Sequence, residues 1–305
     1  MIPLLVIGGP TASGKTAVGI RLAKLLDGEI VSADSMQVYR HMDIGTAKPD
    51  LAERDGIVHH LLDIVEPTEN FSLAQYVPLA HQTIEEIHTR GKLPILVGGT
   101  GLYIDTVVQN IKLSEQEKEA GAVREKLMRQ VEEKGSAWLH EYLEKIDPQS
   151  AAKIHENNVK RLVRAVEVYE LTGVTMSEHN HRSRLEPPRY RTYYMALQHE
   201  RETLYDRIDR RVDVMMQQGL LAEVQQCVTL GAGRQHTSMQ AIGYRQMLDY
   251  LEGNSSLEEA VDKIKQESRR YAKRQLTWFR RSAQHWTKPE ELREEEIIKW
   301  AKGEG

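Results

Sequence analysis

Hydrophobic residues gather in four short runs bounded by turn-forming residues, at 4–7, 29–33, 93–97 and 190–197. Runs of this length predict β-strands, and the last one alternates apolar and polar positions. Apolar residues spaced three and four positions apart predict helices from about residue 15, over 72–90 and after residue 200. Strands that alternate with helices predict an α/β fold with a parallel sheet covered by helices.

The pattern changes to charged, helix-favouring sequence from about residue 114 to the double proline at 187–188. We therefore predict an α/β core formed by 1–113 and 188–289, and a helical insertion at 114–187. Residues 290–305 are predicted to form a C-terminal tail, either a charged helix or a frayed end. Ser256 and Glu259 have the spacing of a capping box that opens a long helix.

Length and composition favour a soluble, two-domain cytoplasmic protein. The chain has 305 residues, of which 40% are hydrophobic, and about 150 residues is usual for one domain. Cys227 is the only cysteine, which excludes an internal disulfide and a cysteine-based metal cluster. No apolar run approaches the ~18 residues of a membrane span, and the first run lacks the basic leader of an export signal. The histidines lack partner cysteines or a HExxH frame, so we expect them to be solvated or capping residues.

A phosphate-binding motif follows the first strand. Gly9-Pro10-Thr11-Ala12-Ser13-Gly14-Lys15-Thr16 matches GxxxxGK[ST] between a predicted strand and helix, where such a motif must lie. Its backbone amides would form a concavity at a helix N-terminus. We predict that Thr11, Ala12, Ser13, Gly14, Lys15 and Thr16 bind a polyphosphate, with Thr16 as a Mg²⁺ ligand. The alternative, an accidental match in a glycine-rich turn, fits the strand-and-helix context poorly.

Asp34 comes just after the second predicted strand. Ligands of open α/β sheets bind at the carboxyl ends of the strands, so this carboxylate should face the phosphate loop. Alone, such an Asp is more often a turn or cap residue. The loops at 43–49 and 97–103 also fit ordinary turn chemistry.

Five segments in order along the chain together carry a family resemblance. They are GPTASGKT, DSMQVY, DIGTAKP, GGTGLY and IGYRQ. From residue 8 to about 281 the chain resembles bacterial tRNA dimethylallyltransferases. The resemblance implies a P-loop NTPase-like fold with a helical insertion. It implies transfer of a dimethylallyl group from dimethylallyl diphosphate to the exocyclic N6 amine of the adenosine 3′-adjacent to the tRNA anticodon, with release of diphosphate and with Mg²⁺ as cofactor.

The resemblance also assigns roles to residues. Asp34 would hydrogen-bond the amine and accept its proton, and Thr100 would assist through its hydroxyl. Because a stacked base cannot reach a pocket at the sheet edge, the adenosine must be flipped out, and Gln37 and Tyr39 are candidates for holding it. Contacts with the tRNA anticodon stem-loop are implied for Ser35, Met36, Gln37, Val38, Tyr39, Arg124, Lys160, Arg161, Arg164, Gln240, Gly243, Tyr244, Arg245, Arg274 and Arg281.

One position departs from the family pattern. Lys160 stands where relatives often have Gln, and an ammonium group lacks the acceptor of an amide. A contact with a base edge is therefore open at this position, whereas a contact with a phosphate is expected. We also expect the protein to act as a monomer.

Charge is distributed unevenly along the chain. The formal net charge is −4, yet residues 268–288 contain seven Lys and Arg and no acidic residue. Polyanion binding depends on such cations, and Tyr271, Trp278 and Phe279 are interleaved with them. The segment therefore fits a face that follows RNA phosphates. In the alternative interpretation its aromatic residues belong to the core and its arginines are merely solvated.

Two other function classes share the phosphate motif. Small-molecule and nucleotide kinases also combine a phosphate loop with an Asp after the second strand, although the sequence shows no nucleotide-base site or arginine-rich lid. A regulatory nucleotide-binding RNA partner without chemistry would have no use for Asp34 and Thr100.

Overall fold

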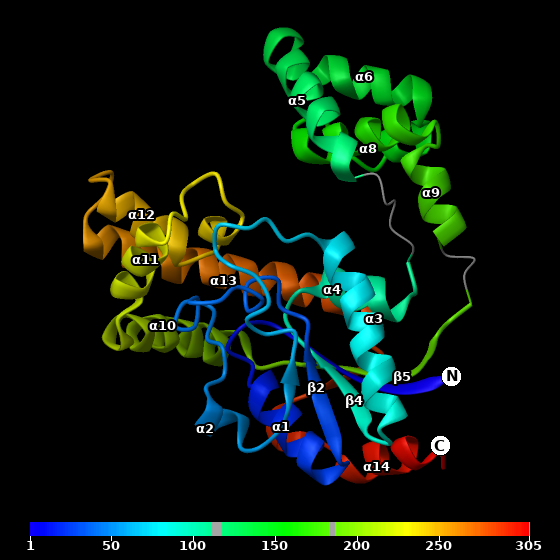
Figure 1. Cartoon of the computed structure of the whole chain (residues 1–305), viewed down its shortest axis with the longest axis vertical. Helices are drawn as coiled ribbons and strands as arrows, with labels where there is room; N and C mark the ends of the chain where they lie inside the picture. The colour runs from blue at the N-terminus through cyan, green and yellow to red at the C-terminus, as the bar shows by residue number, and fades with distance from the viewer. Residues whose placement is uncertain (112–116, 184–186, 305) are drawn as a thin grey trace. The chain divides into compact units, whose positions relative to one another are not determined.

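The computed structural model describes residues 1–111, 117–183 and 187–304 (Figure 1). The chain divides into two compact units, one formed by 1–108 and 189–305 and the other by 109–188. The domain boundary predicted between 113 and 114 lies outside the described residues.

The first unit contains a six-stranded parallel sheet, which confirms the predicted α/β class. Its order is β3-β2-β4-β1-β5-β6. Sequence analysis missed the short edge strands β3 and β6, because two or three residues carry no periodicity. The strands are β1 (Ile2–Gly8), β2 (Gly28–Ser32), β3 (His59–His60), β4 (Leu93–Val97), β5 (Tyr190–Leu197) and β6 (His285–Thr287).

Helices account for most of the rest of this unit. The capping box predicted at Ser256 is present, with Ser256 Oγ accepting a bond from the Glu259 amide. The helices are α1 (Lys15–Leu25), α2 (Leu51–Arg54), α3 (Leu73–Thr89), α4 (Gly101–Val108), α10 (Arg201–Gln218), α11 (Leu220–Thr229), α12 (Tyr244–Leu251), α13 (Leu257–Ser282) and α14 (Glu294–Lys302), with short 3₁₀ turns at Ser238–Gln240 and Pro289–Glu291.

Side chains that alternate along the strands fill two cores. Leu5 and Ile7 of β1 pack with Val18 and Leu22 of α1, whereas Gly8 faces Phe279 of α13. Helices α1 and α14 therefore cover one face of the sheet, and α3, α4 and α13 cover the other (Figure 1). This arrangement exposes the carboxyl edge of the sheet to the loops that follow β1, β2 and β4.

The last residues of the chain belong to this core. Of the two alternatives for 290–305, the structure has the charged helix, α14, but this segment is not a separate tail: Ile297 is buried against the sheet and Trp300 packs beside it. The long polar stretches around these residues hid their contribution, because one buried turn gives too weak a pattern to detect.

The second unit is entirely helical among its described residues. Leu127, Leu139, Leu143, Leu162 and Val166 form its core. Its helices are α5 (Glu117–Lys134), α6 (Ser136–Ile146), α7 (Pro148–Ala151), α8 (Val159–Thr172) and α9 (Met176–Ser183).

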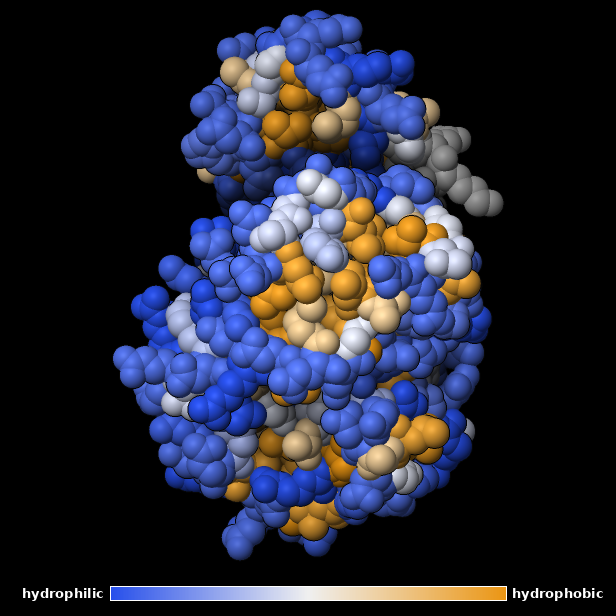
Figure 2. Space-filling view, turned by 90° about the vertical axis from the view of Figure 1, so that its left-hand side faces the viewer, coloured by the Kyte–Doolittle hydropathy of each residue, from blue (hydrophilic) through white to orange (hydrophobic). Residues whose placement is uncertain are grey.

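Within the described ranges, every helix falls short of the length and apolarity that a bilayer span requires. On the face drawn in Figure 2, hydrophobic residues form patches surrounded by hydrophilic ones.

Candidate active site

The phosphate motif forms a tight loop between β1 and α1. Gly9, Ala12 and Gly14 all have positive φ, a curvature typical of loops whose amides form an anion-binding concavity, although the Thr11 and Ser13 amides donate to Gln275 and Pro10. Lys15 is the first residue of α1, so the loop also lies at the positive end of a helix. The local geometry is that of an anion site.

Side chains from distant segments hold this loop in place. The Thr11 amide donates to Gln275 Oε1 of α13 at 2.9 Å, and Arg207 Nε of α10 donates to the Ala12 carbonyl at 2.8 Å. Arg211 Nη1 lies 3.4 Å from Thr11 Oγ1. Helices α10 and α13 therefore fix the loop from two directions.

Lys15 is the electrostatic centre of the loop. Its Nζ donates to the Pro10 carbonyl at 2.6 Å. Burial, followed by the neighbouring charge of Arg211, lowers the pKa of Lys15 to about 7, while Asp34 opposes the shift. A bound anion would favour the protonated ammonium form.

The lowered pKa predicts a pH dependence of anion binding. Above pH 7 the free site loses the Lys15 proton, so affinity for a diphosphate should fall as pH rises, on the order of 10- to 50-fold between pH 7 and 9. Binding of inorganic diphosphate, followed by calorimetry across this range, measures the effect. Lys15→Arg keeps its charge and should remove most of the slope; an equal slope in both proteins would contradict the assignment.

Asp34 and Thr100 come together from the ends of β2 and β4. Asp34 Oδ1 accepts the Met36 amide at 2.9 Å, and Thr100 Oγ1 accepts the Ser35 amide at 3.1 Å. Close strand packing allows this, because a Cβ on Gly98 would lie 2.1 Å from the Ala33 carbonyl oxygen. Thr100 thus reaches the site through Ser35, one residue from Asp34.

Tyr271 of α13 joins this pair. Its hydroxyl lies near the side chains of Thr100 and Gln275, which lower its pKa. Burial, followed by the charge of Asp34, raises the pKa of Tyr271 to about 12. The phenol therefore remains a protonated donor beside the carboxylate at neutral pH.

Lys15, Asp34 and Tyr271 line one cavity of about 400 Å³, whereas Thr100 lies behind Ser35 and is not part of the lining. The phosphate loop contributes residues including Lys15 and Thr16, and Asp34 lies in the same wall. Further walls come from α10, α13 and two loops, including Ser35, Met36, Gln37, Thr46, Ile208, Arg211, Val212, Met215, Gln240, Ile264, Tyr271 and Arg274. The cavity therefore joins an anion site, a carboxylate and an apolar surface.

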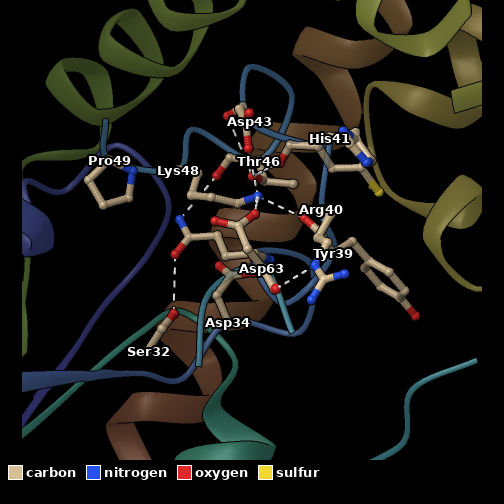
Figure 3. Close-up of polar contacts among 12 residues, drawn as sticks. Ser32, Asp34, Tyr39, Arg40, His41, Asp43, Thr46, Lys48, Pro49 and Asp63 are labelled. Atoms are coloured by element: carbon tan, nitrogen blue, oxygen red, sulfur yellow. Dashed lines mark hydrogen bonds and ion pairs between the residues drawn. The ribbon is translucent and has the colours of Figure 1, made fainter. Parts of the chain in front are cut away.

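The loop 43–49 forms a rigid part of this wall. Lys48 has a side chain that is 2% exposed, and its Nζ donates to Asp43, Asp63 and the Tyr39 carbonyl (Figure 3). Gln37 Nε2 donates to the carbonyls of Thr46 and Ala47, each at 3.3 Å. Lys48 therefore stabilises the conformation of the loop that the motif DIGTAKP forms.

Three of the residues with implied RNA contacts have buried side chains. Val38, Tyr39 and Tyr244 are each 0% exposed and lie outside the cavity lining. The idea that Tyr39 holds the flipped base is therefore corrected: its ring packs in the protein interior. Sequence alone could not reveal this, because a Tyr beside polar motif residues fits either environment.

Among the RNA contacts predicted between residues 240 and 245, Gln240 and Arg245 line the cavity. Arg245 forms an ion pair with Glu267 of α13, and Gly243 is buried at a positive φ of 101° where α12 begins.

The helical unit carries the remaining predicted cations. Lys160 and Arg161 are exposed on α8. Arg124 and Arg164 both pair with the fully buried Glu167, with Arg124 Nε 2.7 Å from Glu167 Oε2. Their side chains are 54% and 40% exposed, and each guanidinium has further donors for another anion.

Helix α13 presents a row of exposed cations. Arg270, Lys273, Arg274, Arg280 and Arg281 are exposed, and among the described residues no carboxylate forms an ion pair with them. Phe279 is buried and belongs to the core, as one interpretation of this segment held. Trp278 is 37% exposed and, like the cations, is accessible to RNA, as the other interpretation held. Trp278 and Arg281 line a second hollow of about 240 Å³ that adjoins Arg274.

The residues present fit a Mg²⁺ ion bound together with a diphosphate. Mg²⁺ prefers hard oxygen ligands and usually takes few from protein, with the rest from phosphates and water. Thr16 supplies a hydroxyl oxygen in the cavity, and the Asp34 carboxylate lies in the same wall. Within the described ranges, groups of three or more His, Cys, Asp or Glu suited to hold a metal are absent.

Sequence reasoning missed Arg211, and it gave no role in the site to Gln275. Both touch the phosphate loop, and Arg211 lowers the pKa of Lys15. Their helices show only amphipathic spacing, in which a site Arg or Gln resembles a solvated one.

The chain is similar in sequence and in structure to transferases that act on tRNA. A family model described as IPP transferase matches residues 37–282. A tRNA dimethylallyltransferase from Acetivibrio thermocellus is 49% identical over 298 residues, or 97% of this chain and 95% of that protein. A full-length tRNA isopentenylpyrophosphate transferase structure from Bacillus halodurans is 46% identical with a TM-score of 0.72, covering 99% and 95% of the chains. A eukaryotic dimethylallyltransferase acting on tRNA is 32% identical with a TM-score of 0.76, covering 92% and 70%.

Proposed function

The chain belongs to the IPP transferase family, and from this premise we propose that it transfers a dimethylallyl group from dimethylallyl diphosphate to the N6 amine of the adenosine 3′-adjacent to the tRNA anticodon. One observation carries the proposal. The phosphate loop and Asp34 open into the same cavity, so a leaving diphosphate and an attacking amine can meet inside it.

The transfer is a substitution at carbon. The adenosine nitrogen forms a bond to C1 of the dimethylallyl group, the C1–O bond breaks, and its electron pair leaves with the diphosphate. Positive charge builds on the allylic carbon while negative charge builds on the diphosphate. No phosphoryl group is transferred.

The phosphate loop stabilises the leaving group. Its amides and Lys15 are preorganised toward the anion, and such donors are effective in a site shielded from water. Arg211 lines the same cavity and adds a second positive charge. When bound, Mg²⁺ would be held by Thr16 and would neutralise diphosphate charge.

Asp34 and its neighbours act on the nucleophile. An exocyclic amine is a weak nucleophile, so its orientation toward the allylic carbon contributes more than early deprotonation. Asp34 Oδ1 is occupied by the backbone amides of Met36 and Gln37, which leaves Oδ2 for the amine and its proton. Thr100 supports this group through its hydrogen bond with the Ser35 amide, and Tyr271 lies beside Thr100.

The apolar wall suits the hydrocarbon tail of the donor. Ile208, Val212 and Ile264 are at most 3% exposed and line the cavity beside Met215. They exclude water from a developing carbocation, which would otherwise be hydrolysed.

The cationic row of α13 suits the RNA. Arg274 lines both the main cavity and the neighbouring hollow, so phosphates next to an inserted base would meet Arg274, Lys273 and Arg281. The exposed Trp278 ring offers a stacking surface for an unpaired base. We propose that Lys160, Arg161, Arg124 and Arg164 contact phosphates of the same tRNA, that one chain suffices for activity, and that the reaction takes place in the cytoplasm.

The proposal is tested by mass spectrometry of nucleosides. Unmodified tRNA is incubated with the protein, Mg²⁺ and dimethylallyl diphosphate, digested, and analysed for adenosine carrying one C₅H₈ unit. A parallel reaction with labelled ATP tests phosphoryl transfer to tRNA or to small acceptors. Prenylated adenosine supports the proposal, whereas labelled phosphate without prenylation would replace it by a kinase.

A further inference from the structure

Loop 43–49 is anchored by one buried carboxylate from α11. Glu223 Oε2 accepts the amides of Asp43 and Ile44 at 2.8 and 2.7 Å, and Oε1 accepts the amide of Gly45 at 2.9 Å. Three successive amides that converge on one anion form a nest. Here the protein fills that nest itself, with a residue that lies 178 positions away along the chain from Gly45.

A close ring contact completes the anchor. A Cβ on Gly45 would lie 2.5 Å from Tyr244 Cε2, so only glycine lets the ring pack on the loop backbone. The Tyr244 hydroxyl donates to Glu223 Oε1. Burial, followed by the charge of Glu223, raises the pKa of Tyr244 well above its usual range, so the hydroxyl remains a donor.

This contact connects two motifs that the sequence presents separately. DIGTAKP contributes Gly45, and IGYRQ contributes Tyr244. Tyr244 is fully buried, which makes a direct contact of its ring with RNA inconsistent with this conformation. Its contacts with Gly45 and Glu223 give it another role.

The anchored loop leads directly to the catalytic end of the cavity. Gln37 Nε2 donates to the Thr46 and Ala47 carbonyls, and Gln37 Oε1 accepts from Ser32 Oγ at 3.2 Å. The backbone amide of Gln37 in turn donates to Asp34 Oδ1 at 3.4 Å. Displacement of loop 43–47 would therefore release Gln37, which lines the cavity beside Asp34.

A purely structural role explains the arrangement less well. Burying a carboxylate is costly, and an apolar contact can stabilise a fold equally well. A carboxylate that collects three amides and a phenol fixes the orientation of a loop backbone, which an apolar contact does not. The loop so fixed is the one whose Gly45, Thr46 and Ala47 form the cavity wall.

We propose that Glu223 is a positioning residue for the acceptor nucleoside: together with Tyr244 it presets loop 43–47 and, through it, Gln37, so that the wall is shaped before the base enters. The inference rests on the proposed function. A change at Glu223 should therefore weaken the binding of tRNA but leave the binding of the diphosphate donor unchanged, because the phosphate loop is held by α10 and α13 instead.

Glu223→Gln tests this difference between the two substrates. The variant keeps the shape but places an NH₂ group against amides that need an acceptor. We expect KM for tRNA to rise 10- to 100-fold, KM for dimethylallyl diphosphate to change less than twofold, and hydrogen exchange of the peptide containing 43–47 to become faster. Glu223→Asp, which restores a carboxylate, should recover part of the tRNA affinity. Equal changes in both KM values, or unchanged exchange, would overturn the proposal.

Two further variants control for the general effect of removing a buried carboxylate and for misfolding of Glu223→Gln. Glu29→Gln is the matched control, a buried carboxylate whose partners are the side chains of His60 and Arg90; both KM values should stay near wild type. If Glu223→Gln does not fold, Tyr244→Phe removes only one donor, and its tRNA KM should still rise severalfold while the donor KM is constant. The exchange measurement needs no turnover, so it separates failure of this inference from failure of the proposed function.

Discussion

Lys15→Ala should reduce kcat/KM for the diphosphate donor by about 3 × 10³- to 5 × 10⁵-fold. Truncating one partner of a buried charge pair costs about 2–5 kcal/mol, and losing a donor to a developing anion lowers kcat by a further factor of about 10². Lys15 Nζ lies at the Pro10 carbonyl of the loop, whereas Arg211 reaches the loop at Thr11, so Arg211 should replace only part of the lost charge. Steady-state kinetics with a varied donor concentration measure the loss.

The same variant should bind tRNA almost as well as wild type, because the row of cations on α13 is untouched. Lys24→Ala provides a matched control, since Lys24 lies on the same helix, is exposed, and pairs only with Asp55. Its kinetics should be unchanged. Wild-type turnover in Lys15→Ala would end the assignment of the loop as the diphosphate site.

Asp34→Asn should slow the single-turnover rate of prenyl transfer by about 10²- to 10⁴-fold, the usual contribution of a positioned general base. The amide keeps an oxygen for the backbone donors at Met36 and Gln37, so the local turn should survive. The variant cannot accept the proton that leaves the amine. Rapid-quench kinetics with enzyme in excess over tRNA isolate this step from product release.

Donor affinity should change much less than the rate in Asp34→Asn, because Lys15 and the loop amides remain in place. Asp27→Asn serves as the control, an exposed acid that pairs with Lys92 at the start of β2. If the single-turnover rate of Asp34→Asn equals that of wild type, Asp34 has no role as proton acceptor.

The pattern of apolar residues determined most of the fold. Four strands and the helices α1, α3, α10 and α13 follow from local periodicity, because each buries one face over several turns or residues. The phosphate loop also follows from local sequence, since its chemistry needs adjacent residues between a strand and a helix. Edge strands of two and three residues are too short for such a pattern, and the charged sequence of α14 left open whether it forms a helix or a frayed end.

The shape of the site depended on contacts between distant segments. Arg211 and Gln275 contact the phosphate loop at Thr11, which precedes them by 200 and 264 positions in the chain. Tyr271 lies near Thr100, which is also distant from it in the sequence. Local sequence gives an arginine on an amphipathic helix the same appearance whether it faces solvent or a cavity. Only the packing of α10 and α13 against the sheet decides which one it faces.

The sequence by itself therefore determined the class of fold, the anion site and the carboxylate beside it, because these depend on neighbours in the chain. The tertiary structure alone decided which motif residues line the cavity and which support it. Tyr39, Lys48 and Tyr244 all lie in motif segments, yet their side chains are buried. Burial is a property of the folded surroundings, and a motif carries no record of it.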